Sequence, residues 1–158
     1  MIEKANAIEK GPDGNRTVSR HLTADHERLD ALFDEACTCV GKGDFVGAIG
    51  AFHTFAHGLQ HHIDIEERFL FPVFDARVPM RGPTTVMRHE HRSIEQLLAL
   101  ATASLRAHDA AQFGTEAAEL AALLRAHNLK EERVLYPRTD AALDDAERAE
   151  LVTALELY

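Results

Sequence analysis

Two segments of the chain repeat one arrangement of histidine and glutamate, HHIDIEERFLFP at 61–72 and HNLKEERVLYP at 127–137. Both contain the pattern H-x3-E-E-R-x-L-[FY]-P, and an offset of 65 residues carries His62 onto His127 and Glu66 onto Glu131. Residues four positions apart on a helix lie one turn apart on the same face. Imidazole nitrogens and carboxylate oxygens suit a first-row transition metal. Each segment therefore predicts half of a metal site.

The repeat extends upstream, because the same offset carries His26 onto His91. The neighbours of these residues on their helix faces are apolar, so all six polar side chains are expected to point into a core. An uncompensated ion there costs on the order of several kcal/mol, and no arginine or lysine occupies a matching inward position. A polar network without metal would have to satisfy every lone pair itself. We therefore expect two metal ions that share the carboxylates, held by His26, His62, Glu66, His91, His127 and Glu131.

Helices must carry these residues. Apolar residues recur at spacings of three and four in four long segments, which glycine and proline separate. Strand-like alternation is absent from the sequence. Expected helix starts are marked by capping residues or proline at Asp44, Pro83, Thr115 and, for a short last helix, Asp144 with Glu147.

The pattern predicts an all-α fold, an antiparallel up-down-up-down four-helix bundle with a short fifth C-terminal helix. We expect one domain at 17–158, after a flexible N-terminal segment at 1–16.

Composition restricts the class of partner. The chain has 158 residues and a formal net charge of −9, which argues against nucleic acid or an anionic membrane as partner. It has neither the apolar core of a signal peptide nor a membrane span, so a cytoplasmic protein is expected. Cys37 and Cys39 are too close in sequence to close a useful disulfide loop, and we expect them to be reduced.

The motif set resembles the hemerythrin-like, or HHE cation-binding, domains over about residues 18–140. The resemblance implies a four-helix bundle that holds a non-haem di-iron centre, with zinc or manganese as other possible metals. It further implies that the four histidines are terminal ligands and that Glu66 and Glu131 bridge the two irons.

One position departs from the oxygen-carrying hemerythrins, which have a further histidine where this chain has Met87. Their last bridging acid is also an aspartate at a longer spacing. The resemblance is therefore to a symmetric branch with fewer histidines. Glu90 and Glu95 are candidates to fill the open position, and roles beside the ligands or in solvent are the alternative.

The remaining histidines are not expected to bind this metal pair. His53, His57 and His61 share another helix face, and alanines occupy the equivalent positions in the second copy. They are interpreted as a solvated, pH-sensitive surface, with a second metal site as the alternative. His21, His89 and His108 fall out of phase with the apolar stripes or in a loop. Tyr136 replaces Phe71 in the repeat, and its hydroxyl is expected either near one metal or in the packing of the wall.

Two functional hypotheses follow. In the first, the centre handles O2, NO or peroxide by binding, sensing or detoxification. In the second, the chain is a cation-binding or iron-handling structural or regulatory module without redox turnover. Whether the protein is an enzyme, and its oligomeric state, stay open at this point.

Overall fold

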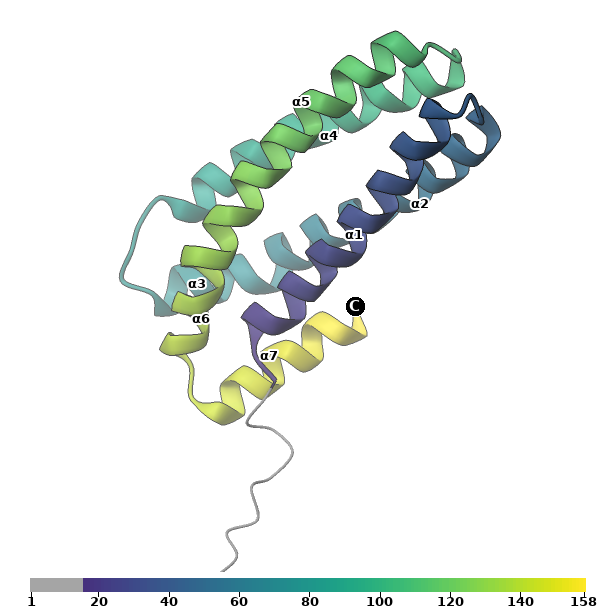
Figure 1. Ribbon diagram of the computed structural model, residues 1–158. Coiled ribbons are helices and arrows are strands. Elements are labelled where there is room, and N and C mark those ends of the chain that lie inside the picture. The colour runs from purple at the N-terminus through teal and green to yellow at the C-terminus, as the bar shows by residue number, and fades with distance from the viewer. Residues whose placement is uncertain (1–15) are drawn as a thin grey trace, which may run out of the picture.

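The computed structural model describes residues 16–158, and all the regular structure in that range is helical. This confirms the predicted all-α class for the described residues. The predicted flexible segment at 1–16 lies outside them except for Arg16. In chain order the elements, whose α-helices Figure 1 shows, are α1 (Val18–Gly41), α2 (Phe45–Ile65), η1 (Glu66–Leu70), α3 (Phe71–Arg77), α4 (Pro83–Arg106), α5 (Ala110–Lys130), η2 (Glu131–Leu135), α6 (Tyr136–Ala142) and α7 (Asp145–Leu157).

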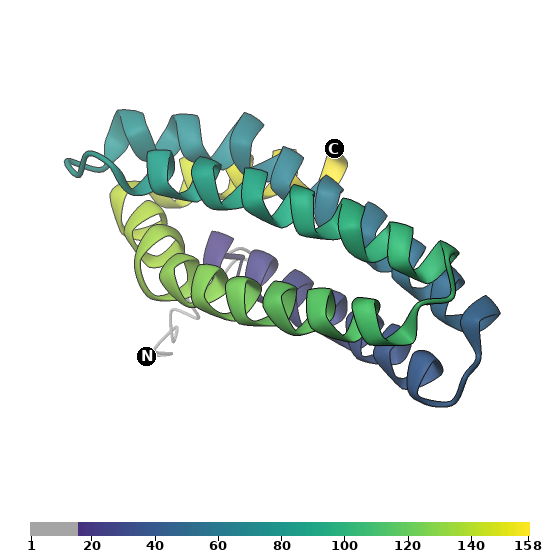
Figure 2. The ribbon, with the colours of Figure 1, turned by 90° about the horizontal axis from the view of Figure 1, so that it is seen from above.

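The long helices form two hairpins. Helix α1 packs against α2, and α4 packs against α5. The hairpins meet along two seams, α2 against α4 and α1 against α5, and Figures 1 and 2 show the four helices running side by side. Helix α7 lies against α1 and η1. This arrangement brings the two copies of the repeat face to face.

The starts of α2 and α5 repeat each other. The Asp44 side chain accepts a hydrogen bond from the backbone N–H of Gly47, which confirms the predicted cap of α2. In the second copy Asp109 accepts from the N–H of Gln112 in the same way. The predicted start at Thr115 is therefore wrong, because the capping carboxylate stands six residues earlier and begins the helix there.

The other predicted helix starts are confirmed. Pro83 is the first residue of α4, where its missing N–H has no helical partner to lose. Asp144 accepts from the N–H of Glu147 while the Glu147 side chain accepts from the N–H of Asp144, so a capping box begins α7.

Each repeated segment contains a π-helical turn that ends two residues before its proline. The N–H of Phe71 donates to the carbonyl of Glu66, and the N–H of Tyr136 donates to the carbonyl of Glu131. These bonds span five residues instead of four. Pro72 and Pro137 stand at the beginning of the α-helix that resumes after each turn, where a missing N–H is tolerated. The chain therefore carries α2 into α3 and α5 into α6 without a loop.

Apolar side chains form two clusters separated by a polar layer. One cluster fills the space among α1, α2, α4 and α5, and the other lies around α3, α6 and α7. On α1 Leu22 belongs to the second cluster and Leu29 to the first, with His26 between them. The described helices include none with the length and apolar character of a membrane span.

Candidate metal centre

The six predicted ligand residues meet in the polar layer. All are buried, none with more than 4% of its surface exposed, and they come from α1, from α2 with η1, from α4 and from α5 with η2: His26, His62, Glu66, His91, His127 and Glu131. Two groups could each hold an ion, Glu66 with His91, His127 and Glu131, and His26 with His62 and Glu131. Their role as ligands remains a prediction.

The imidazoles face each other in pairs. Nε2 of His26 lies 3.1 Å from Nε2 of His62. The same distance separates the Nε2 atoms of His91 and His127. Each pair joins the two helices of one hairpin, so each hairpin contributes one half of the centre.

Each buried carboxylate reaches both halves. Glu66 places Oε1 3.5 Å from Nε2 of His62 and Oε2 3.4 Å from Nε2 of His91. Glu131 places Oε2 3.3 Å from Nε2 of His26 and Oε1 3.0 Å from Nε2 of His127. The two glutamates therefore stand between the halves with one oxygen directed to each.

In each of the four histidines of the centre, the other ring nitrogen, Nδ1, lies within hydrogen-bond distance of a carboxylate outside the centre. Nδ1 of His62 lies 2.9 Å from Asp25, and Nδ1 of His127 lies 2.8 Å from Glu90. Asp25 and Glu90 are themselves related by the repeat offset.

The remaining two histidines are held across the hairpins. Nδ1 of His26 lies 2.8 Å from Glu132, and Nδ1 of His91 lies 2.8 Å from Glu67. An ionised carboxylate only accepts hydrogen bonds, so each Nδ1 carries a proton, and Nε2 is the nitrogen that each ring can offer to a metal once it is deprotonated.

The donor set fits the binding of metal ions. Neutral imidazoles with protonated Nδ1 present four lone pairs to a space that also contains two carboxylates. Within the described chain, Oε2 of Glu66 and Oε1 of Glu131 are the buried side-chain atoms without a hydrogen-bond partner. Unpartnered buried carboxylate oxygens are costly unless a cation compensates them. Nitrogen and oxygen donors in this mixture suit iron, manganese or zinc.

Without metal, protons take the place of the cation. Burial disfavours charged imidazole, but the charge of Glu66 and the hydrogen bond to Asp25 raise the pKa of His62 from 6.5 to about 10. Burial also disfavours the charged form of His127, but Glu131 raises the pKa of this imidazole from 6.5 to about 9. Burial opposes ionisation of Glu66, yet His62 holds the pKa of that carboxyl well below 4.5. The centre therefore favours positive charge at its middle.

Tyr136 is part of the centre and not only of its wall. Its hydroxyl lies 2.7 Å from Oε1 of Glu66 and 3.1 Å from Oε2 of Glu131. The π-helical turn explains this position, since a bond spanning five residues stacks Tyr136 over Glu131, whereas a regular helix would stack Leu135 there. Burial, together with the charges of both glutamates, raises the pKa of the Tyr136 hydroxyl well above 10.

The candidates for the position opened by Met87 lie elsewhere. Glu90 binds Nδ1 of His127 and the amine of Lys130, on the outer side of the imidazole. Glu95 is exposed and accepts a hydrogen bond from Gln60. Met87 itself is buried in the apolar cluster beside α3 and α6.

The other histidines stay outside the described metal-capable groups, as expected. His53 and His57 are exposed on α2, and His61 stacks on the ring of Tyr158. His89 and His108 are exposed as well.

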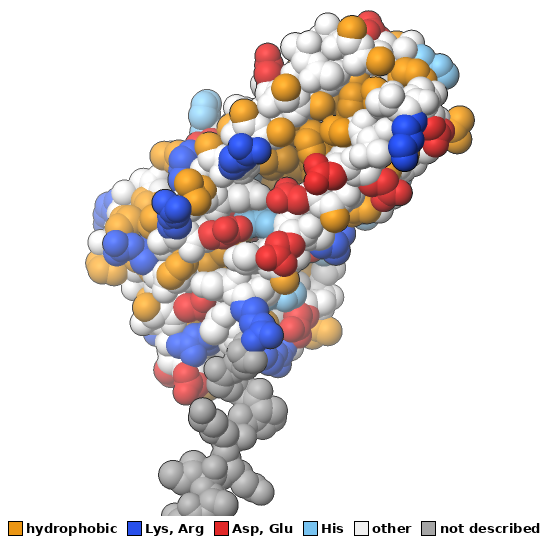
Figure 3. Space-filling view, viewed as in Figure 1, with side chains coloured by type: hydrophobic (Ala, Val, Ile, Leu, Met, Phe, Trp, Pro, Cys, Tyr) orange, Lys and Arg blue, Asp and Glu red, His pale blue; other side chains and the backbone are white. Residues whose placement is uncertain are grey.

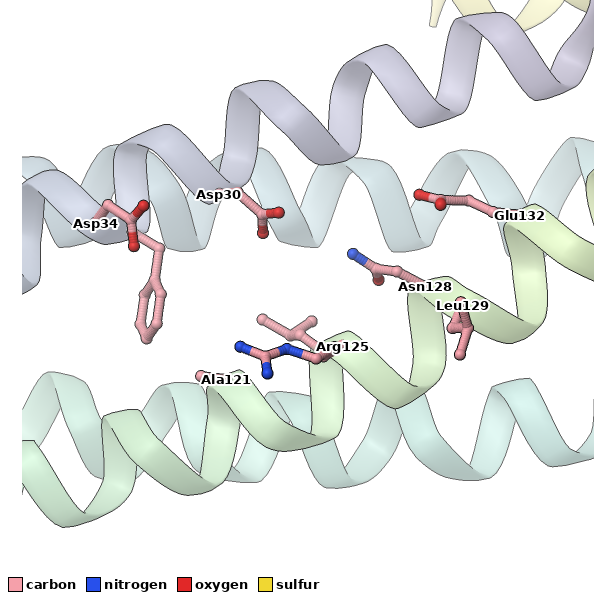
Figure 4. Close-up of a pocket in the computed structure, with 9 residues that line it drawn as sticks. Asp30, Asp34, Ala121, Arg125, Asn128, Leu129 and Glu132 are labelled. Carbon is pink, nitrogen blue, oxygen red and sulfur yellow. The ribbon is translucent and has the colours of Figure 1, made fainter.

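A cavity of about 390 Å³ opens beside the centre, between α1 and α5. Figure 4 shows Asp30 and Asp34 from α1 facing Arg125 and Asn128 from α5. Glu132, which holds Nδ1 of His26, also lines this cavity. Figure 3 shows acidic side chains along the groove and hydrophobic side chains at its floor. The cavity therefore ends one side chain away from the centre.

Fold and site together define an all-helical protein with a buried histidine and carboxylate cluster suited to cations. The family model described as hemerythrin HHE cation binding domain matches residues 17–139. The chain belongs to this family. No curated protein and no solved structure gave a match.

Proposed function

We propose that residues 17–158 form one hemerythrin-like domain, an antiparallel up-down-up-down four-helix bundle with a short fifth helix, that holds a non-haem di-iron centre and handles O2, NO or peroxide. The four histidines serve as terminal ligands and the two buried glutamates as bridges. Manganese or zinc could occupy the same donors. Binding, sensing and detoxification are all compatible with this site.

One observation carries the proposal. An outer carboxylate holds a proton on Nδ1 of each of the four histidines, so Nε2 is left to bind a metal, and each glutamate directs one oxygen to each half. A preformed set of this kind binds a metal pair with little rearrangement.

The surrounding residues exclude bulk water from the centre and leave a route by which small molecules can reach it. Iron, when bound, supplies redox chemistry and open coordination positions for a small ligand. The two apolar clusters keep bulk water away from both sides of the layer. Asp30, Asp34 and Glu132 make the neighbouring cavity acidic, which favours entry of cations or neutral molecules over anions. O2, NO and hydrogen peroxide are small and neutral.

Elemental analysis of protein purified without added metal tests the centre. We expect about two irons per chain. Glu66→Ala or Glu131→Ala should abolish the pair, because each removes an oxygen from both halves, whereas His57→Ala on the exposed face of α2 should leave metal content unchanged. Equal losses from Glu66→Ala and His57→Ala would refute the assignment.

Stopped-flow mixing of the reduced protein with O2, NO and peroxide then tests the reactivity, and inertness toward all three would refute the proposed handling of these molecules.

Complete burial favours a second candidate, a cation-binding or iron-handling structural or regulatory module without redox turnover. The centre joins both hairpins at one layer, so a redox-silent ion there would hold them together. Zinc as the metal of the purified protein, with no reaction toward the three small molecules, would support this function over the first.

A further inference from the structure

Tyr136 breaks the equivalence of the two halves at the buried carboxylates. Tyr136 and Phe71 correspond in the repeat, and both are fully buried. A phenyl ring fills the wall at Phe71, so packing alone does not explain a hydroxyl group at Tyr136. A buried hydroxyl requires hydrogen-bond partners, and the contacts of this one are specific.

The hydroxyl serves one half of the centre. Its partners Glu66 Oε1 and Glu131 Oε2 are the two carboxylate oxygens directed to the half that contains His26 and His62. The Tyr136 oxygen also lies 3.2 Å from Nε2 of His26 and 3.5 Å from Nε2 of His62. All four inward donors of this half therefore surround the phenol oxygen.

In residues 16–158 the other half has no such group. Its carboxylate oxygens, Glu66 Oε2 and Glu131 Oε1, are the two buried atoms that lack a hydrogen-bond partner among the described residues. Phe71 stacks on His91 with ring centroids 5.5 Å apart and offers neither a donor nor an acceptor. Met87 and its repeat counterpart Leu22 are both apolar and buried, so neither supplies a polar group that would compensate for the missing hydroxyl.

We propose that Tyr136 makes the two metal positions chemically inequivalent, because a hydroxyl group serves the position held by His26 and His62 and none serves the position held by His91 and His127. This inference rests on the proposed function and deepens it. A hydrogen bond or an added oxygen donor changes the field that the carboxylates impose on a metal. Tyr136 is thus a positioning residue for the bridging glutamates of one half.

Mössbauer spectroscopy of the all-ferrous protein, prepared without oxygen, reads each iron separately and does not depend on activity. We expect two quadrupole doublets of equal area for the unchanged chain. Tyr136→Phe makes the residue identical to its repeat counterpart, so the doublets should move together toward one. Tyr158→Phe changes the other tyrosine of the chain, which stacks on His61 outside the centre, and should leave the spectrum unaltered.

Reciprocal variants separate a specific effect from a general disturbance. Phe71→Tyr should also bring the doublets together, and the double exchange of Phe71→Tyr with Tyr136→Phe should restore the difference. Two unchanged doublets in Tyr136→Phe would overturn the inference. Metal content is measured on the same samples, so about two irons per chain with an unchanged spectrum would reject the role of Tyr136 alone, whereas absence of bound iron from every sample would reject the proposed centre.

Discussion

At the scale of single residues, the different roles of Nδ1 and Nε2 in each imidazole decide what the centre can bind. One ring nitrogen is fixed outward by a carboxylate and the other is left free inward. Glu90 illustrates the outer role, because it holds Nδ1 of His127 and is itself held by Lys130. Outer partners of this kind orient the ring, fix its tautomer and raise its basicity toward a metal.

Glu90→Gln should weaken metal binding about 10- to 100-fold, the range found for outer-sphere partners, because the amide removes the negative charge that supports the His127 imidazole. Competition of the metal-bound protein against a chelator of known affinity measures the change. Glu95→Gln is the matched control, since Glu95 lies on the same helix, is exposed and accepts a hydrogen bond from Gln60. Equal affinities for the two variants would contradict the outer role of Glu90.

The stability of the metal-free protein should fall as pH rises from about 7 to 10. The pKa values of His62 and His127 are raised in the folded state to about 10 and about 9. Their stabilising contribution is therefore complete below the unfolded-state pKa of about 6.5 and is lost as pH rises through the folded values.

Thermal melts of the chelated protein across this pH range measure the effect. The metal-bound protein should show the opposite sign, because metal binding needs deprotonated imidazoles and strengthens as protons leave. A melting temperature of the chelated protein that rises toward pH 10 would contradict the assignment. Replacing both Glu66 and Glu131 with glutamine should flatten its pH dependence.

The sequence predicted the six residues that meet in the centre because a repeat displays them twice at one spacing. The outer carboxylates share that repeat, yet composition alone does not distinguish them from solvated acids. The sequence does not decide whether the Tyr136 hydroxyl lies at the centre or in its wall. A period of 3.6 residues assigns Leu135 to the face of Glu131, and only the five-residue bond of η2 brings the tyrosine there.

At the scale of elements, a regular helical period also does not show where an α-helix gives way to a π-helical turn. A π-helical turn depends on tertiary packing, and the residues of η1 and η2 carry no local signal for it. Pro137 is expected from the sequence to end a helix, whereas it lies in the first turn of α6. The start of α5 differs from the prediction because Asp109, the repeat counterpart of the capping residue Asp44, caps this helix.

Asp109→Ala should lower the free energy of unfolding by about 1 kcal/mol, because the N–H of Gln112 loses its capping acceptor. Denaturant titration of the metal-free variant measures this change without a contribution from metal binding. Thr115→Ala is the control. Thr115 is exposed inside α5 and bonds only the carbonyl of Ala111, so its loss should stay within about 0.5 kcal/mol. A larger loss of stability from Thr115→Ala than from Asp109→Ala would instead support a helix start at Thr115.

At the scale of the whole molecule, the polar layer lies between two apolar clusters that do not depend on metal. The larger cluster contains interlocking rings such as Phe33, Phe52 and Phe55, and the smaller one secures α3, α6 and α7. Each cluster should keep its helices together when the centre is empty. Metal then adds stability to a fold that already exists and does not create it.

Chelation should therefore lower the melting temperature while leaving the helical circular dichroism signal at 25 °C nearly unchanged. Ligand present at 100 times its dissociation constant contributes about 2.7 kcal/mol per site, which corresponds to a shift of roughly 5–10 °C for each metal removed from a domain of this size. Glutamine at both Glu66 and Glu131 should make melting insensitive to the chelator, because it removes the charges that bind metal while keeping the side-chain shape. Collapse of the helical signal on chelation would show instead that the two clusters cannot hold the hairpins together, and an unshifted melting temperature of the unchanged chain would argue that the layer binds no metal.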